Sequence, residues 1–160
     1  MAMLKGFKVL SPLLFSEMKI QILVVDDHEI VRKGICRLIE AHEGWQVCGE
    51  AANGKQAIEK ALELTPDVVL MDISMPLMSG LEATRHIRKR FPSMKIAIIS
   101  LHESHHVMAE ARNAGADAYL LKSDPSCELE RTISGLVMTI PKGAADRPGA
   151  PVSAEAASAD

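Results

Sequence analysis

Residues 68–72 read Val-Val-Leu-Met-Asp, an apolar run of strand length that ends on a carboxylate. Large aliphatic residues in immediate succession are typical of a strand that is buried on both faces of a parallel sheet. A second run, at residues 20–25, reads Ile-Gln-Ile-Leu-Val-Val and is followed by Asp26 and Asp27. The two runs predict two buried strands, each of which carries acidic side chains to its carboxyl end.

Three more apolar runs, at residues 46–51, 96–100 and 118–121, complete the series. Amphipathic stretches separate the five runs, and their apolar residues recur every three or four positions, as helices require. Strands that alternate with helices form a parallel sheet covered on both faces. We therefore predict an α/β domain of the (βα)₅ type, with a doubly wound five-stranded parallel sheet. By analogy with the flavodoxin-like fold, the expected strand order is 2-1-3-4-5.

The chain has 160 residues, of which 48% are hydrophobic, and this suits one domain with some excess. We place that domain at residues 18–140. Residues 1–17 are predicted to be a poorly ordered N-terminal extension. Residues 141–160, rich in Ala, Pro, Gly and Ser, are predicted to be a disordered tail because they hold almost no large apolar residue.

The N-terminal apolar run at residues 9–15 is short, contains Pro12 and lacks a small-x-small cleavage site, so we do not interpret it as a signal peptide. No apolar run reaches the roughly 20 residues that cross a bilayer. The expectation is a cytoplasmic protein without a membrane partner. The net charge of −3 also argues against a nucleic-acid surface, and no direct DNA binding is expected.

Two groups of residues look functional but have simpler explanations. The one basic cluster is predicted to be a solvated helix face and consists of Arg85, Arg88, Lys89 and Arg90. The cysteines are odd in number, have no metal or redox spacing and are predicted to be small buried residues in a reduced cytosol; they are Cys36, Cys48 and Cys127.

Polar side chains end four of the predicted strands and should meet at one edge of the sheet. They are Asp26, Asp27, Asp72, Ser100 and Lys122. A single Asp or Ser at such a place more often caps a helix or a turn. Adjacent carboxylates are different, because two charges about 4 Å apart repel by roughly 4 kcal/mol at an effective dielectric of 20. A lysine or Mg²⁺ relieves this repulsion, and Mg²⁺ keeps waters that phosphoryl oxygens can replace.

The motifs around these residues resemble the receiver domain of bacterial two-component response regulators. Residues 22–28 resemble the first strand and acidic pair of that family, and residues 68–76 resemble its phosphorylation-site strand and loop. Residues 115–123 resemble the segment that carries its switch aromatic and its lysine. The Asp-Asp-His opening and the Lys-Ser pair at residues 122–123 are most similar to the NarL/FixJ subgroup. The resemblance covers about residues 19–140.

The resemblance implies a role for each matching residue. Asp72 would accept a phosphoryl group from the phosphohistidine of a sensor histidine kinase or phosphotransfer protein. Ser100 and Lys122 would contact phosphoryl oxygens, and Tyr119 would change rotamer as Ser100 moves. The Mg²⁺ ligands would be Asp26, Asp27, Asp72 and the backbone carbonyl of Ser74. The protein would be no enzyme beyond its own phosphoryl transfer and dephosphorylation.

Departures from the family pattern are small within the domain. Ser100 replaces the commoner Thr, Ser79 stands where an acidic residue is frequent, and Ala118 stands where the subgroup often has Gly. The subgroup usually continues into a helix-turn-helix domain that binds DNA, whereas here residues 141–160 follow. We therefore expect a stand-alone receiver that signals to a downstream protein through a phosphorylation-dependent surface. Its kinase, its target, the lifetime of its phosphorylated state and any homodimer stay open.

Other functions fit less well. A degenerate, non-phosphorylated protein-binding module is the main alternative, and the complete set of polar strand ends argues against it. A haloacid-dehalogenase-like phosphatase needs Asp-x-Asp where this chain has Asp72-Ile73-Ser74. A dinucleotide-binding enzyme needs a glycine-rich turn after the first strand. A truncated transcription factor would share the receiver and differ only in its output.

Several single residues are expected to be structural. His102, His105 and His106 have a spacing that could bind a metal on a helix, but we expect surface residues at the start of the fourth helix. His28 is predicted to pack against or cap a helix start. Trp45 is predicted to be an anchor near the second strand, and Asp67 to cap a turn.

Overall fold

The computed structural model describes residues 19–123 and 125–140, and its strands form one parallel sheet. The strands are β1 (Ile20–Val25), β2 (Trp45–Ala51), β3 (Val68–Asp72), β4 (Lys95–Ser100) and β5 (Ala118–Leu121). Their order is β2-β1-β3-β4-β5, and every neighbouring pair is parallel. The predicted class and strand order are confirmed. Predictions for residues 1–17 and 141–160 lie outside the described residues.

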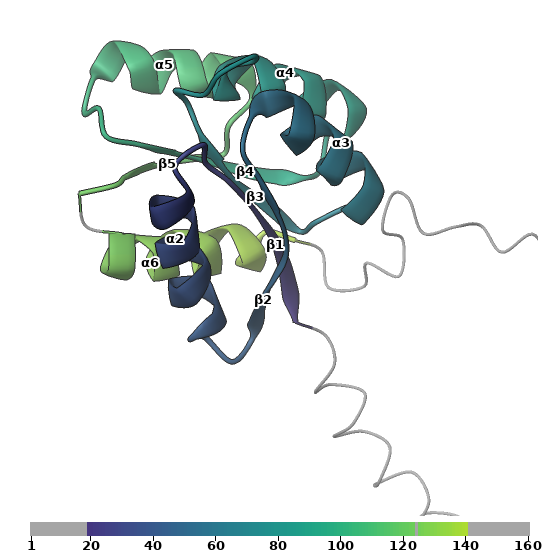
Figure 1. Ribbon diagram of the computed structural model, residues 1–160, viewed down its shortest axis with the longest axis vertical. Coiled ribbons are helices and arrows are strands. Elements are labelled where there is room, and N and C mark those ends of the chain that lie inside the picture. Colours follow the sequence, from purple (N-terminus) through teal and green to yellow (C-terminus); the bar gives the residue numbers. More distant parts are fainter. Residues whose placement is uncertain (1–18, 124, 141–160) are drawn as a thin grey trace, which may run out of the picture.

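Helices cover both faces of the sheet. They are α2 (Glu29–Glu40), α3 (Gly54–Leu64), α4 (Gly80–Arg90), α5 (His105–Ala114) and α6 (Pro125–Met138). Figure 1 shows α3, α4 and α5 on one face and α2 with α6 on the other. Right-handed crossovers place consecutive helices in this way whenever the strand order reverses direction. In the described residues, no helix is both long and apolar enough to cross a membrane.

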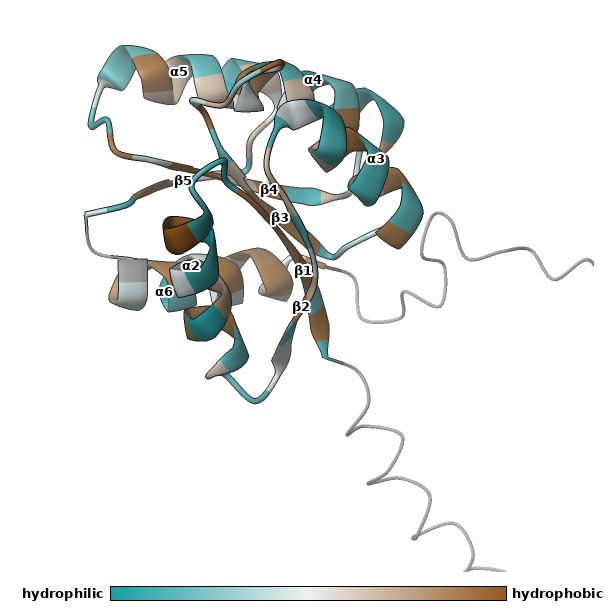
Figure 2. Cartoon of the chain, viewed as in Figure 1, coloured by the Kyte–Doolittle hydropathy of each residue, from teal (hydrophilic) through white to brown (hydrophobic). Residues whose placement is uncertain are grey.

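The core has two halves because alternate residues of each strand face opposite sides of the sheet. On β1, Leu23 and Val25 pack with the half under α3, α4 and α5, whereas Ile22 and Val24 pack with the half under α2 and α6. All residues of β3 are buried. Figure 2 shows the apolar colour along the strands and the polar colour on the outer helix surfaces. Burial on both faces explains why the strands are nearly continuous apolar runs.

The loop between β3 and α4 is held tightly against the end of β3. The Gly80 N–H donates a hydrogen bond of 2.9 Å to the carbonyl oxygen of Ile73. A Cβ atom at Gly80 would lie 1.8 Å from the carbonyl oxygen of Asp72, so a larger residue would displace the backbone. A glycine here therefore lets α4 begin directly beside the strand end that carries Asp72.

A capping box begins α4. The Ser79 hydroxyl oxygen accepts a hydrogen bond from the Glu82 N–H at 3.2 Å, and the Glu82 carboxylate accepts one from the Ser79 N–H at 3.1 Å. Ser79, a departure from the family pattern, is thus the N-cap of α4. The Ser-x-x-Glu spacing before an apolar residue is itself a signal for this motif.

Two predictions about individual residues are wrong. Arg88 is not part of a solvated face: it is half-buried, and its guanidinium donates to the carbonyl oxygens of Pro92, Met94 and Gly115. Sequence spacing could not reveal this, because the acceptors come from other parts of the chain. Cys127 is exposed on α6, whereas Cys36 and Cys48 are half-buried, and all three cysteines are free.

Candidate functional site

The carboxyl ends of the strands bring the predicted polar residues to one edge. Val25 at the end of β1 pairs with Met71 on β3, so Asp26 and Asp72 follow at neighbouring positions. The N–H of Lys122 donates to the carbonyl oxygen of Ser100 at 2.8 Å, which places these two residues side by side. A pocket of about 310 Å³ opens at this edge; its lining includes Asp72, Ser74, Ser100 and Lys122.

Lys122 bridges two of the carboxylates. Its Nζ atom lies 2.7 Å from Asp26 Oδ2 and 3.1 Å from Asp72 Oδ1, and its side chain is 9% exposed. Burial by itself would lower the pKa of Lys122. The hydrogen bonds that Lys122 makes to Asp26 and Asp72, together with the negative charges of these residues, outweigh burial and raise the pKa. The site therefore holds a fixed ammonium group.

Asp72 is a buried acid with a raised pKa. Its carboxylate is nearly buried, with 4% of the residue exposed. Burial raises the pKa of Asp72, Lys122 lowers it, and the charges of Asp26 and Asp27 raise it again, so that the pKa stays above its usual value. The single ammonium group does not fully offset burial and repulsion, and a further cation at this place would be stabilised.

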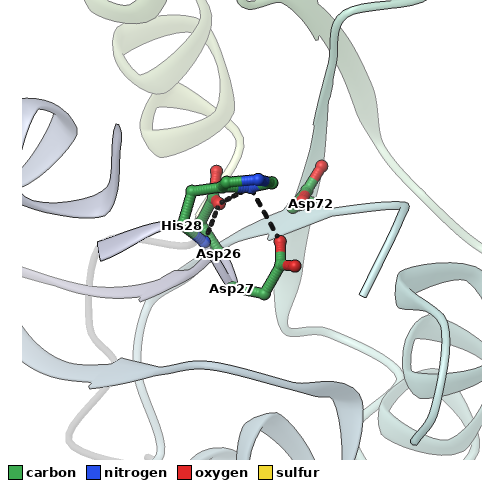
Figure 3. Close-up of side chains that lie close together, drawn as sticks. All are labelled: Asp26, Asp27, His28 and Asp72. Carbon is green, nitrogen blue, oxygen red and sulfur yellow. Dashed lines mark hydrogen bonds and ion pairs between the residues drawn. The ribbon is translucent and has the colours of Figure 1, made fainter. Parts of the chain in front are cut away.

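The donor set fits a hard divalent cation. Ligand atoms of Asp26, Asp27, His28 and Asp72 all lie within 4.8 Å of one another. Figure 3 shows Asp26 and Asp27 beside the His28 ring, with Asp72 facing them from β3. Oδ1 of Asp27 is buried and makes no hydrogen bond, although His28 Nδ1 lies 3.1 Å from it. Three carboxylates beside an open pocket suit Mg²⁺, which binds one or two carboxylates and keeps waters in its other positions.

His28 lies on the rim of this cluster. It is the N-cap residue of α2, but its side chain makes no capping hydrogen bond. Its Nδ1 atom is 3.1 Å from Asp27 Oδ1 and 3.6 Å from Asp26 Oδ1, and the side chain is 71% exposed. His28 therefore occupies the predicted position at the helix start, while its imidazole faces the acidic pair and does not cap the helix.

Ser100 and Tyr119 contact the same residue in the loop between β4 and α5. The Ser100 hydroxyl oxygen, which is almost fully buried, accepts a hydrogen bond from the His102 N–H at 3.1 Å. The Tyr119 hydroxyl donates a hydrogen bond of 2.6 Å to the carbonyl oxygen of His102. A movement of the His102 backbone would therefore change the hydrogen bonds of both hydroxyl groups.

The three histidines with helical spacing are surface residues, as expected. His102 lies in the loop, while His105 and His106 begin α5, and all three are exposed. The metal-ligand cluster found in the described chain is the acidic one and does not include them. His106 Nε2 lies 3.6 Å from Glu110 Oε1, a contact within the helix.

Trp45 has the structural role we expected, and Asp67 is also structural, but its carboxylate bonds to β1 and not within a turn. Trp45 is 6% exposed and its ring stacks on His42 with a centroid distance of 3.9 Å. The Asp67 carboxylate accepts a hydrogen bond of 2.8 Å from the backbone N–H of Gln21. Neither residue contributes to the acidic cluster.

Comparisons with known proteins agree with this geometry. The family model described as the response regulator receiver domain matches residues 22–134. A transcriptional regulatory protein of Bacillus subtilis, LnrK, is 43% identical over 124 residues, which are 78% of this chain and 54% of that protein. The response regulator GacA of Pseudomonas viridiflava is 41% identical over 114 residues, which are 71% of this chain and 53% of that protein.

Solved structures show the same likeness. A LuxR-family two-component response regulator from Aurantimonas has a TM-score of 0.72 at 40% identity, over 75% of this chain and 86% of that one. The receiver domain of a NarL regulator from Mycobacterium tuberculosis has a TM-score of 0.72 at 29% identity, over 76% of this chain and 98% of that one. The chain spans about half the length of the curated relatives described above.

Proposed function

Because the chain belongs to the family of response regulator receiver domains, we propose that Asp72 accepts a phosphoryl group from a phosphohistidine and thereby switches a signalling surface. The observation that carries this proposal is the contact of a buried Asp72 with Lys122, next to the acidic pair of Asp26 and Asp27. Phosphoryl transfer needs positioning and charge neutralisation more than covalent assistance, and this site supplies both.

The reaction follows from the groups present. An oxygen of the Asp72 carboxylate attacks phosphorus, the bond from phosphorus to the donor imidazole nitrogen breaks, and the electron pair of that bond stays on the imidazole. The product is an acyl phosphate, which water can hydrolyse again. Lys122 lies 3.1 Å from Asp72 Oδ1 and would pair with a phosphoryl oxygen. Mg²⁺, held by Asp26, Asp27, Asp72 and the carbonyl of Ser74, would neutralise further phosphoryl charge.

Ser100 and Tyr119 would transmit the effect of phosphorylation from the site to the protein surface. The Ser100 hydroxyl has a donor proton that a phosphoryl oxygen can accept, and the group borders the pocket. When the hydroxyl turns toward the phosphoryl group, its hydrogen bond from the His102 N–H weakens, and the bond from Tyr119 to His102 moves with it. Added phosphoryl charge would thus shift the loop between β4 and α5 toward a second arrangement.

The partners follow from this reaction. The phosphoryl donor would be a sensor histidine kinase or a phosphotransfer protein. Another protein would bind the surface that changes on phosphorylation. Relatives such as LnrK are named as transcriptional regulatory proteins. Our proposal for this chain is restricted to the receiver's own exchange and to protein contact.

Intact mass after incubation with Mg²⁺ and acetyl phosphate tests the proposal. We expect one added phosphoryl group in the wild type, which disappears after treatment with hydroxylamine. Asp72→Ala should show no gain. Glu103→Gln, which changes an exposed acid in the loop after β4, is the matched control and should be phosphorylated like the wild type. A gain that persists in Asp72→Ala would falsify the assignment, and no gain in the wild type would favour the non-phosphorylated binding module.

A further inference from the structure

Asp26 is fixed at all of its polar atoms. The residue is fully buried, and its N–H donates to the carbonyl oxygen of Ala51 at 3.1 Å. Its Oδ1 atom accepts from the His28 N–H at 2.8 Å, and its Oδ2 atom lies 2.7 Å from Lys122 Nζ. The remaining atom, the backbone carbonyl oxygen, accepts a hydrogen bond of 2.7 Å from Nη1 of Arg32.

Arg32 reaches this carbonyl from α2 and is itself held by its neighbours. Its side chain is 14% exposed, and its Nε atom lies 3.6 Å from Oε1 of Glu50 on β2. The same oxygen of Glu50 accepts a hydrogen bond of 3.2 Å from the Cys36 thiol. Burial, together with the bond to Glu50, raises the pKa of Cys36 to about 12, so the thiol stays a neutral donor. The guanidinium is therefore oriented on one side by Glu50 and on the other by Asp26.

We propose that Arg32 is a positioning residue for divalent-cation binding, which acts by fixing the peptide plane between Asp26 and Asp27. This inference rests on the proposed function. The carbonyl of Asp26 and the N–H of Asp27 belong to one rigid plane, so holding the carbonyl also sets the direction in which the chain enters Asp27. Asp27 Oδ1 makes no hydrogen bond, and its side-chain neighbour is the exposed imidazole of His28, with Nδ1 3.1 Å away, so the direction of the backbone contributes to placing this carboxylate.

Charge and position predict opposite effects when Arg32 is replaced. Arg32 is a cation near an acidic cluster, so its charge alone opposes the binding of a second cation. Removing only that charge would strengthen Mg²⁺ binding. Releasing the Asp26 carbonyl would weaken it, because Asp27 would then have to be ordered at the moment of binding. The sign of the change in affinity therefore separates the two effects.

Calorimetric titration of Mg²⁺ into the full chain without a phosphodonor measures this sign. For Arg32→Gln we expect binding about tenfold weaker than in the wild type, a size typical of residues that orient metal ligands. For Arg32→Lys we expect a loss of several-fold at unchanged charge, because one ammonium lacks the fork that spans both Glu50 and the Asp26 carbonyl. Arg37→Gln removes the same charge from an exposed residue of the same helix and should not weaken binding.

Thermal unfolding of each variant shows whether it is folded. Should Arg32→Gln not fold, Arg32→Lys carries the test. The inference is overturned if the folded Arg32 variants bind Mg²⁺ as tightly as the wild type or more tightly. A wild type that is phosphorylated on Asp72 while these variants bind normally overturns this inference alone. A wild type that neither binds Mg²⁺ nor gains a phosphoryl group overturns the proposed function and this inference together.

Discussion

Lys122 lies between two buried carboxylates that come from the ends of adjacent strands. Asp26 and Asp72 both contact its ammonium group, and Asp27 adds a third carboxylate nearby. The cluster thus has more negative than positive charge, and two of its three carboxylates are buried. Such an arrangement reduces the stability of the folded chain and favours a ligand that brings positive charge.

Replacing Lys122 with Met should destabilise the protein. The change leaves Asp26 and Asp72 buried without their cation, and breaking a buried pair in this way costs about 3 kcal/mol. Chemical denaturation at neutral pH measures the loss. We also expect added Mg²⁺ to restore a larger share of stability in Lys122→Met than in the wild type. An equal effect of Mg²⁺ on both proteins would contradict the account of Lys122 as an internal counter-ion.

Replacing Asp72 with Asn should stabilise the protein at neutral pH. The pKa of Asp72 is raised in the folded chain, mainly by burial, so ionisation of this group favours the unfolded chain. Below the unfolded pKa both states are protonated and the variant should gain nothing. The gain in the free energy of unfolding should appear as pH rises from the pKa of Asp72 in the unfolded chain through its pKa in the folded chain. It should approach about 1 kcal/mol. Denaturation curves between pH 3 and pH 8 measure this difference, and a gain that is independent of pH would contradict it.

At the scale of elements, α4 begins directly after the loop that follows β3. Ser79 caps the helix, and Gly80 allows its first turn to approach the carbonyl oxygen of Asp72. The start of α4 is therefore in direct backbone contact with the end of β3. A change in the cap should affect both the stability of the helix and the loop that carries Ser74.

Replacing Ser79 with Ala should lower the free energy of unfolding by about 1 kcal/mol, as is typical for an N-cap. The hydrogen bonds from Ser79 lower the pKa of Glu82, so the stability from this pair is present above the unfolded pKa. It is lost as pH falls through the folded pKa, and the difference between Ser79→Ala and the wild type should shrink there. Ser104→Ala is the matched control, because Ser104 is the N-cap of α5 and its side chain makes no capping hydrogen bond. Equal losses in the two variants would count against the capping box.

At the scale of the whole molecule, Arg88 connects parts of the chain that are far apart in sequence. Its guanidinium reaches from α4 to Met94 before β4, and to Gly115 and Asp117 between α5 and β5. Asp117 in turn accepts a hydrogen bond of 2.8 Å from the Ile96 N–H at the start of β4. These contacts lie at the amino ends of β4 and β5 and leave the opposite ends free for the site.

Replacing Arg88 with Lys should destabilise the protein by about 2 kcal/mol, since a compact ammonium group cannot span the separated acceptors that the planar guanidinium reaches from different nitrogen atoms. Arg85→Lys makes the same change at an exposed position of the same helix and should have almost no effect. Thermal and chemical unfolding of the pair measure the difference. Similar stability in the two variants would show that the guanidinium contacts contribute little.

The sequence alone determined the fold class and the place of the site. Apolar runs of strand length require burial on both faces, and helices between them supply that cover. Each strand end is also visible in the sequence, as at Asp72, so the residues that share an edge follow once the strands are parallel. The strand order came from analogy with a known fold, and the structure confirms it.

Only the tertiary structure decided how the site is supported. Arg32 and Arg88 act on backbone carbonyl groups, which every residue has, so no side-chain pattern indicates which carbonyl a guanidinium will reach. His28 faces Asp27 because the direction of α2 after β1 is set by packing against the sheet. Local periodicity fixes which residues are buried and which end a strand. Which polar groups meet depends on how segments that are far apart in the sequence pack together, and this in turn depends on the packing of the whole core.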